Sequence, residues 1–251
     1  MAPAPSDALD ASLSAPRAVQ SVIAVGGGRG GVGKSIVAVN VAVYLAQLGR
    51  TVALVDSDPA GAELHTLLGV QVPVSDPGRE DDQDEELPLL ATAVPGLRLL
   101  PQTYARGSTL PDRPGRKARW VSRLRHLDVD HVIVDLGAGT APATLDLFLS
   151  ADVGVCVTTP EPPSVETTYR FLRALYMRSL RRLLIKDRFK LRLVERAQST
   201  LPPLPSPLEL VRCLARFDST VAELAASELA QLRPRLVVNG TRLRTDGDLG
   251  S

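Results

Sequence analysis

Residues 28–35 place the strongest constraint on how this chain can fold. They read Gly-Arg-Gly-Gly-Val-Gly-Lys-Ser and fit the pattern G-x-x-x-x-G-K-[ST]. A β-branched run at 21–25 precedes them and a helix-length apolar run at 36–48 follows, which is the context that this motif requires. Glycines let successive backbone N–H groups face one point, and the start of a helix adds its positive end there. The segment therefore predicts a loop that holds phosphate groups.

Two side chains of this loop carry most of its expected chemistry. Lys34 should reach the β- and γ-phosphates of a nucleotide, and the Ser35 hydroxyl should bind Mg²⁺. The alternative is a glycine-rich turn with a chance lysine, which leaves the coincidence of strand, glycines, Lys-Ser and helix unexplained. The residues predicted to bind the cofactor are Gly28, Arg29, Gly30, Gly31, Val32, Gly33, Lys34, Ser35 and Ile36.

Hydrophobic patterning predicts an α/β fold, a doubly wound, mostly parallel sheet flanked by helices. The expected strands are continuous apolar runs, which is typical of parallel strands covered on both faces. Strands are expected at 21–25, 51–55, 97–100, 132–135, 153–158 and 236–238. Helices are expected at 36–48, 60–68, 113–126, 140–149 and 164–184, with two short ones after the proline-rich connector 201–207. The apolar stripe of the longest helix should consist of Leu172, Leu175, Tyr176, Leu180 and Leu183.

Composition favours one nucleotide-binding domain over residues 21–251, after a disordered leader at 1–20 that is rich in Ala, Pro and Ser. The formal net charge is +1, so no global field attracts the chain to nucleic acid or membrane. An acidic run at about 75–87 predicts a solvated loop, with partner binding as the alternative. Cys156 lies in an apolar run, which favours a buried thiol. The absence of a disulfide pattern or a long apolar run favours a cytoplasmic protein.

Three acids stand where the strands of such a sheet would end. Asp56 and Asp58 follow the second expected strand, and Asp135 ends the strand at 132–135. The carboxyl ends of parallel strands face the ligand crevice, so these acids could hold Mg²⁺ or orient a water molecule toward the γ-phosphate. Capping of strand-to-helix turns is the alternative for any one of them, and it explains all three together less well.

Several segments, taken in order, are similar to those of one known family. Residues 29–35 resemble the deviant Walker A motif, K-G-G-x-G-K-[ST], of the MinD/ParA ATPases. Residues 56–59 look like that family's switch I, and residues 135–139 like its Walker B and switch II. Further similar segments are the turn at 159–161 and the strand at 237–239. The resemblance covers about 21–240, and residues 60–69 lean toward the MinD-like branch that includes flagellar-number regulators.

The resemblance implies an ATP-dependent cycle. Two monomers would sandwich two ATP·Mg²⁺ and bind a surface or partner, until hydrolysis, stimulated by an activator protein, releases them. By motif position, Asp58 would orient the attacking water, with Lys34 and Arg29 as the other catalytic residues. Asp56 and Asp135 would support Mg²⁺ together with Ser35. Asn239 would hold the adenine.

The chain departs from the family's pattern in three places. Arg29 stands where the family has the lysine that reaches across the dimer, and arginine keeps the charge but has a different reach and geometry. Glu63 stands where relatives often have Asn, and an acid near a partner's nucleotide is repulsive unless it is paired. Relatives also continue beyond Asn239 with further elements, so we expect the last C-terminal elements of the fold to be missing.

A basic segment at 170–196 leaves the choice of partner open. It carries ten Lys and Arg residues and few acids. Non-specific DNA, a protein or membrane headgroup, and a merely solvated helix face are all compatible with it. Two functions remain: an ATP-driven dimerisation switch with slow ATPase activity that positions cellular machinery, or a nucleotide-binding scaffold that has lost hydrolysis. A metabolic P-loop kinase is disfavoured because no separate substrate lid is apparent.

Overall fold

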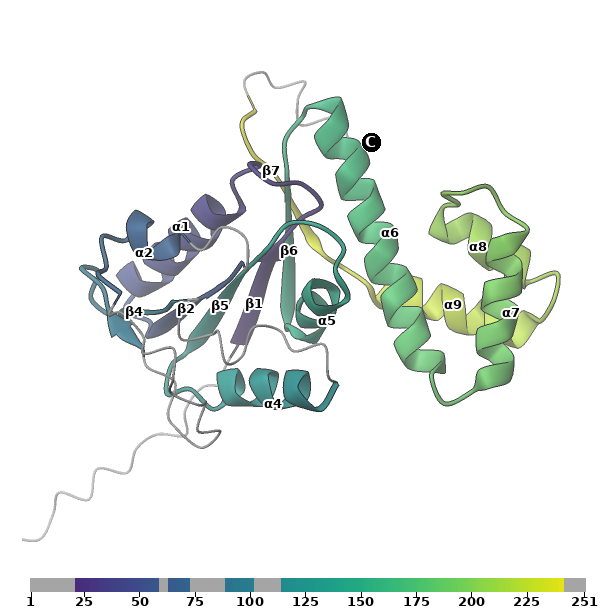
Figure 1. The fold of residues 1–251 in the computed structure, drawn as a ribbon, viewed down its shortest axis with the longest axis horizontal. Helices are drawn as coiled ribbons and strands as arrows, with labels where there is room; N and C mark the ends of the chain where they lie inside the picture. Colours follow the sequence, from purple (N-terminus) through teal and green to yellow (C-terminus); the bar gives the residue numbers. More distant parts are fainter. Residues whose placement is uncertain (1–20, 59–62, 73–88, 102–113, 242–251) are drawn as a thin grey trace, which may run out of the picture.

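The computed structural model describes residues 21–58, 63–72, 89–101 and 114–241, and its framework is a twisted seven-stranded sheet (Figure 1). The strand order is β3-β4-β2-β5-β1-β6-β7, and every pairing is parallel except that of β3 with β4. The strands are β1 (Ser21–Gly26), β2 (Val52–Ser57), β3 (Leu90–Ala91), β4 (Leu97–Leu100), β5 (His131–Leu136), β6 (Val153–Thr158) and β7 (Arg235–Val238). The predicted doubly wound, mostly parallel sheet is confirmed.

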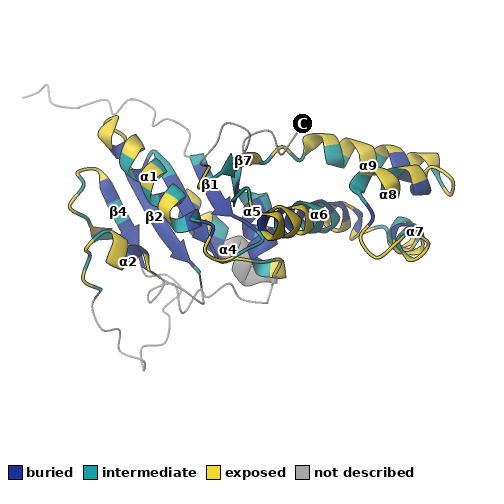
Figure 2. Cartoon of the chain, turned by 90° about the horizontal axis from the view of Figure 1, so that it is seen from above, coloured by how far each residue is buried: buried dark blue, intermediate teal, exposed yellow. Residues whose placement is uncertain are grey.

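Helices cover the two faces of this sheet unequally. The described helices are α1 (Lys34–Gln47), α2 (Leu64–Leu67), α4 (Pro114–Arg125), α5 (Pro142–Ser150), α6 (Pro162–Leu184), α7 (Arg188–Ser199), α8 (Pro207–Leu214) and α9 (Ser219–Gln231). On one face, α1 packs Ala38, Ala42 and Ala46 against strand residues such as Leu54 and Ile133. On the other face lie α4, α5 and the first half of α6 (Figure 2).

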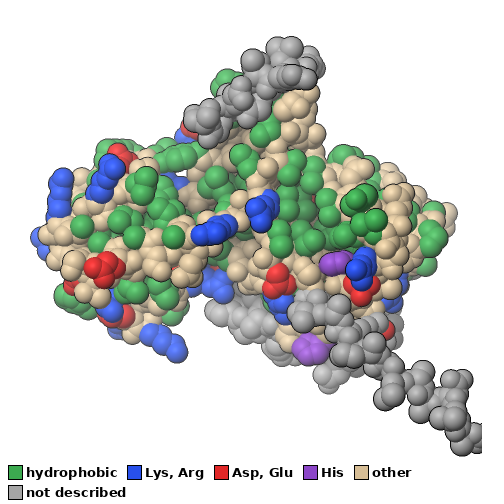
Figure 3. Space-filling view, turned by 180° about the vertical axis from the view of Figure 1, so that it is seen from behind, with side chains coloured by type: hydrophobic (Ala, Val, Ile, Leu, Met, Phe, Trp, Pro, Cys, Tyr) green, Lys and Arg blue, Asp and Glu red, His purple; other side chains and the backbone are tan. Residues whose placement is uncertain are grey.

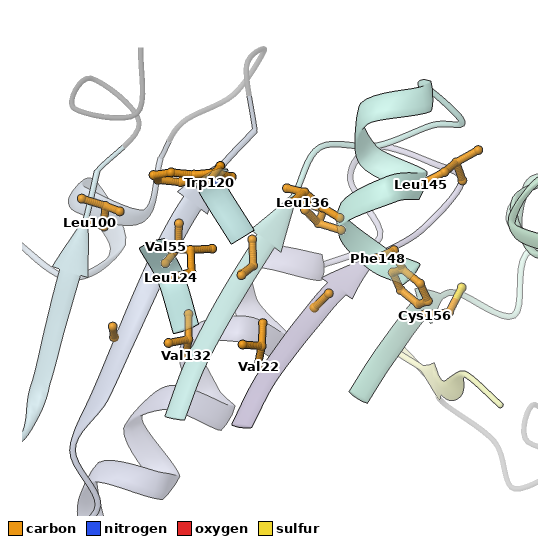
Figure 4. Packing of buried hydrophobic residues seen from close by; sticks show 14 of the residues in the cluster. Val22, Val55, Leu100, Trp120, Leu124, Val132, Leu136, Leu145, Phe148 and Cys156 are labelled. Carbon is orange, nitrogen blue, oxygen red and sulfur yellow. The ribbon is translucent and has the colours of Figure 1, made fainter. Parts of the chain in front are cut away.

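The core beneath α4, α5 and α6 is aliphatic, with a few aromatic rings set into it (Figure 4). Trp120 of α4 lies over the sheet, and Phe148 of α5 meets Phe171 of α6 edge to face, with ring centroids 5.4 Å apart. Cys156 of β6 is fully buried in this core, and burial raises the pKa of its thiol to about 12. The prediction of a buried thiol is therefore confirmed.

The second half of α6 leaves the sheet and joins α7, α8 and α9 in a helical lobe (Figure 1). The lobe has its own core, in which Tyr176, Leu180 and Leu184 of α6 meet Val194 of α7 and Leu214 of α8. Sequence patterning did not predict α7 as a separate helix. Its signal was Asp187, whose side chain accepts a hydrogen bond from the Lys190 N–H and so caps the helix.

One residue of the predicted stripe on α6 was assigned wrongly. Leu183 is half exposed, whereas its neighbour Leu184 is buried in the lobe core. Positions 180, 183 and 184 stand at spacings of three and four, which both place a residue on the same helix face. Since both candidates are leucine, only the contact of Leu184 with α7 decides between them.

Some predictions fall outside the described residues. These are the leader at 1–20, the acidic loop at 75–87 and the first residues of the helix expected at 60–68, of which the described part is the short α2. Among the described residues, no helix combines the length and the apolar character needed to cross a bilayer.

Candidate nucleotide-binding site

The loop between β1 and α1 is shaped by glycine at its turns and at its close contacts. Gly31 and Gly33 adopt φ values of 75° and 91°, which favour glycine because other residues carry a Cβ that collides with the backbone there. A Cβ on Gly27 would lie 2.6 Å from the Val157 carbonyl oxygen, and one on Gly28 would overlap the backbone of Thr167 in α6. The loop is thus pressed between β6 and α6, while Gly30 and Gly31 face open space.

The start of α1 supplies the positive end of the predicted phosphate site. Its N-cap is Gly33, which has no side chain to bond the free N–H groups of the first turn, and no acid lies in that turn. Lys34 is buried, and its Nζ donates a hydrogen bond to the Arg29 carbonyl oxygen at 3.1 Å, so the ammonium lies inside the loop. Free N–H groups and an ammonium around one loop form an anion site. Ile36 is half exposed in the same first turn.

Two of the predicted metal-binding acids lie side by side at the carboxyl edge of the sheet. Asp56 of β2 and Asp135 of β5 are register partners on adjacent strands, and both are buried. Burial raises the pKa of Asp135 to about 7, although the Ser35 hydroxyl hydrogen-bonds this carboxyl and lowers it. Burial likewise raises the pKa of Asp56 to about 6, against hydrogen bonds from the Leu64 and Asp58 N–H groups. The positive charge of Lys34 also lowers the pKa of Asp135, but by less than burial raises it.

These residues fit a magnesium ion. Oδ1 of Asp135 is buried and has no hydrogen-bond partner among the residues that the structure describes. Buried polar atoms are normally paired, so an unpaired carboxylate oxygen beside Asp56 and Ser35 indicates an ion or water site. Oxygen ligands from carboxylates and a hydroxyl are what Mg²⁺ prefers. The structure therefore brings Ser35, Asp56 and Asp135 together as predicted, although their role as metal ligands stays a prediction.

Arg29 points toward α6 of its own chain. Its Nη1 donates to Ser164 Oγ at 3.3 Å and lies 3.6 Å from Glu161 Oε2. Ser164 is itself held by a hydrogen bond from the Thr159 hydroxyl at 2.7 Å. Sequence reasoning noted the turn at 159–161 but missed Glu161 and Ser164 as partners of Arg29. No local signal could have found them, because about 135 residues separate the two segments.

The remaining predicted residues lie around the same edge. Asn239 follows β7, and its side-chain amide donates to the Val32 carbonyl oxygen at 2.9 Å, so the end of β7 is fastened to the phosphate loop. The Gly139 N–H donates to the Gly27 carbonyl oxygen and joins the segment after β5 to the same loop. Asp58 follows β2 directly, and Glu63 is exposed at the start of α2. The roles of Asn239 with adenine and Asp58 with water stay predictions.

Comparison with known proteins matches the part of the chain that builds this site. The ParA family model, described as NUBPL iron-transfer P-loop NTPase, matches residues 18–180. The antiactivator FleN of Pseudomonas aeruginosa is 31% identical over 156 residues, which cover 61% of this chain and 56% of that protein. An iron-sulfur cluster carrier protein of Synechocystis is 34% identical over 62% of this chain and 45% of its own length.

The chain is also similar to a second flagellar protein and to a solved nucleotide-bound structure. The flagellum site-determining protein YlxH of Helicobacter pylori is 28% identical over 60% of this chain and 52% of its own length. The crystal structure of a cobyrinic acid a,c-diamide synthase from Mycobacterium smegmatis with a bound ATP analog and magnesium has 29% identity. That match covers 62% of this chain and 67% of that one, with a TM-score of 0.51. The chain spans about half the length of the curated relatives it matches.

Proposed function

Because this chain belongs to the MinD/ParA family of P-loop NTPases, we propose that it is an ATP-dependent dimerisation switch that positions or regulates cellular machinery. It binds ATP with Mg²⁺ and hydrolyses ATP slowly, and a protein activator speeds the hydrolysis. Relatives named as a flagellum site-determining protein and as an antiactivator support a positioning or regulatory role. The magnesium-bound and nucleotide-bound structural relative supports the choice of cofactors.

One observation carries the proposal: a cationic phosphate loop stands next to a pair of buried acids. Lys34 and the free N–H groups of α1 bind the phosphates, and Ser35, Asp56 and Asp135 hold the metal. When bound, Mg²⁺ offsets negative charge on the phosphates and on the two carboxyls. Asp58 stands beyond the buried pair, at the end of β2, and orients the attacking water.

The dimer requires Arg29 to exchange partners. Within one subunit its guanidinium is bound to Ser164 and Glu161, and both members of the ion pair are well exposed. Exposed ion pairs contribute at most about 1 kcal/mol, so a phosphate group offered by a second subunit can displace Glu161. Arginine is suited to this exchange because its planar fork binds two phosphate oxygens at once.

Two other functions have some support. A scaffold that binds nucleotide without hydrolysis is favoured by the contacts of Arg29 within its own chain, if they persist when ATP is bound. An iron-sulfur carrier is suggested by the family description and by several relatives of that name. Cluster binding uses accessible thiolates, whereas the two cysteines of this sequence, Cys156 and Cys213, are both buried and lie on separate elements. The switch is therefore preferred.

Size-exclusion chromatography with light scattering tests the switch. With ATP·Mg²⁺ the chain should shift from monomer to dimer, and with ADP it should not. Asp58→Ala should keep ATP and stay dimeric for longer, while Lys34→Ala should remain monomeric under all conditions. If neither the native chain nor Asp58→Ala dimerises with ATP, the switch model fails. A dimer that forms with ATP but releases no phosphate in either protein would instead identify the scaffold.

A further inference from the structure

The turn between α6 and α7 exposes more apolar surface than a solvated helix end requires. Ile185 and Phe189 are 69% and 68% exposed and are the two most exposed large hydrophobic side chains in the described part of the chain. Leu183, two residues before Ile185, is half exposed. We call residues 181–192 the α6–α7 tip. Three large exposed apolar side chains thus lie between residues 183 and 189. Apolar exposure gathered in this way marks an interaction site more often than a lone exposed leucine does.

Positive charge is concentrated at the same tip. Residues 181–192 hold six cations and one acid, whereas the whole chain has a net charge of only +1. The basic segment at 170–196 divides into two groups by contact. The cations of the first group each contact another residue of the chain. These contacts are Arg170 with Glu166, Arg173 with Pro205, Arg178 with Asp146, Lys190 with Asp187 and Arg196 with Phe217.

The other group lies entirely within the tip. Its side chains are exposed and make no hydrogen bond or ion pair with any residue that the structure describes: Arg181, Arg182, Lys186, Arg188 and Arg192. Arg188 and Arg192 stand one turn apart on α7, so they project from the same side of that helix. The cations that the chain does not use for its own structure are therefore those that surround the exposed apolar side chains.

The tip is a convex, well-supported projection. Leu184 and Val194 are buried directly beneath it in the core of the lobe, and Asp187 caps α7. Figure 1 shows the turn at the free end of the lobe, with no other element beyond it, and Figure 3 shows Lys and Arg side chains along the outer edge of the lobe. α6 spans 23 residues, so about 34 Å of helix separate this turn from Glu161 and the phosphate loop.

We propose that the α6–α7 tip docks on an anionic phospholipid bilayer, with Ile185 and Phe189 inserted at the level of the headgroups and the free cations around them on lipid phosphates. A bilayer interface offers hydrocarbon and negative charge within one side-chain length, which matches the two features of the tip. Long basic side chains extend to the headgroups while an aromatic ring enters the interface. A nucleic-acid backbone would satisfy the cations but leave Ile185 and Phe189 in water. This docking does not depend on the nucleotide site or on dimerisation.

Flotation of the full chain with vesicles tests the proposal. The chain should bind vesicles of phosphatidylcholine mixed with phosphatidylglycerol, bind pure phosphatidylcholine much less, and dissociate at high salt. The pair Arg188→Gln and Arg192→Gln should lower the partition coefficient about thirty-fold. The pair Ile185→Ser and Phe189→Ser should lower it at least about tenfold, with little change in the salt dependence.

Matched controls lie elsewhere in the same lobe. Leu208 of α8 is also exposed, and Arg212 and Arg216 lie in or just after α8. Leu208→Ser, or Arg212→Gln with Arg216→Gln, should leave vesicle binding within about twofold of the native chain. All these sites are exposed, and circular dichroism checks that the variants fold. Equal losses from control and tip variants, or no vesicle binding at all, overturn the proposal. Binding to duplex DNA without binding to anionic vesicles overturns it in favour of nucleic acid.

Discussion

The carboxyl edge of the sheet and the α6–α7 tip use charge in opposite ways. At the sheet edge, Asp56, Asp135 and Lys34 are buried, and the charges of Asp56 and Lys34 shift the pKa of Asp135 in opposite directions. At the tip, five of the six cations are exposed and have no partner within the described chain. Buried, mutually coupled charges suit the binding of a small ion or nucleotide, whereas exposed charges suit a large, yielding surface. Helix α6 joins the two regions.

The largest effect is expected from Leu180→Ala, which tests whether the stability of the lobe is independent of nucleotide binding at the sheet edge. Leu180 is fully buried in the lobe core, and Leu180→Ala should destabilise the lobe by about 3 kcal/mol through the cavity it leaves. Urea unfolding and hydrogen exchange in α7 to α9 would measure the loss, and ATP affinity should change less than about twofold. Leu183→Ala, at a half-exposed position of the same helix, should cost less than about 0.5 kcal/mol. Equal losses at the two sites would mean that Leu183, as first predicted, belongs to the core.

The next prediction removes one charge from the sheet edge. Lys34→Met keeps the apolar stem of the side chain, which packs beside Gly27, but removes the ammonium. ATP affinity should fall about 100-fold, because a hydrogen bond to a charged group contributes a few kcal/mol in a buried site. Isothermal titration calorimetry would measure it. Lys190→Met in the lobe, where the ammonium pairs with Asp187, serves as the control and should leave ATP affinity unchanged. A comparable loss in both variants would show that the two regions are coupled.

The sequence was most informative where the signal is local. The strands and the phosphate loop could be predicted because apolar runs, glycines and the Lys-Ser pair occupy consecutive positions. The three acids could be placed at one edge because parallel strands end together. Their mutual burial could not be predicted, because it depends on Asp56 and Asp135 being register partners.

The features that could not be predicted depend on contacts between distant segments. Arg29 meets Ser164 only because the phosphate loop is pressed against the start of α6. The choice of Leu184 over Leu183 depends on where α7 returns across α6. The basic segment gave one uniform pattern in the sequence, and only the structure separates the cations with partners from the five at the tip that have none among the described residues.

The third prediction is a gain in stability, and it concerns Asp135. Its pKa rises from 3.8 in the unfolded chain to about 7, so the folded state retains a proton that the unfolded state loses above pH 4. Stability is therefore lost as pH rises from about 4 to 7, and the full cost is present above pH 7. In the absence of nucleotide and Mg²⁺, Asp135→Asn should be more stable than the native chain by about 2 kcal/mol at pH 8. The difference should vanish near pH 4.

Urea unfolding at several pH values in EDTA measures this gain. The control is Asp130→Asn, because hydrogen bonds from Thr51 lower the pKa of the exposed Asp130 carboxyl. Loss of that carboxylate should reduce stability slightly at neutral pH, which is the opposite sign. If Asp135→Asn is no more stable than the native chain at pH 8, the negative charge of Asp135 does not destabilise the folded chain. The sheet edge would then not differ from the tip in the way that its buried charges suggest.

The smallest expected effect concerns an ion pair between the two regions. Arg178 of α6 binds Asp146 of α5 through two hydrogen bonds of 2.7 and 2.6 Å, and the carboxylate is mostly buried. Arg178→Gln should cost about 1 kcal/mol, because it leaves a buried acid with fewer donors. Arg170→Gln, which breaks an exposed pair with Glu166 on the same helix, should cost only about 0.3 kcal/mol. Thermal unfolding at low and high salt compares them. If both variants lose the same stability and the loss depends on salt, Arg178 behaves like the solvated cations of the lobe. If Arg178→Gln loses more stability and the loss does not depend on salt, Arg178 belongs with the buried charges of the sheet domain and not with the tip.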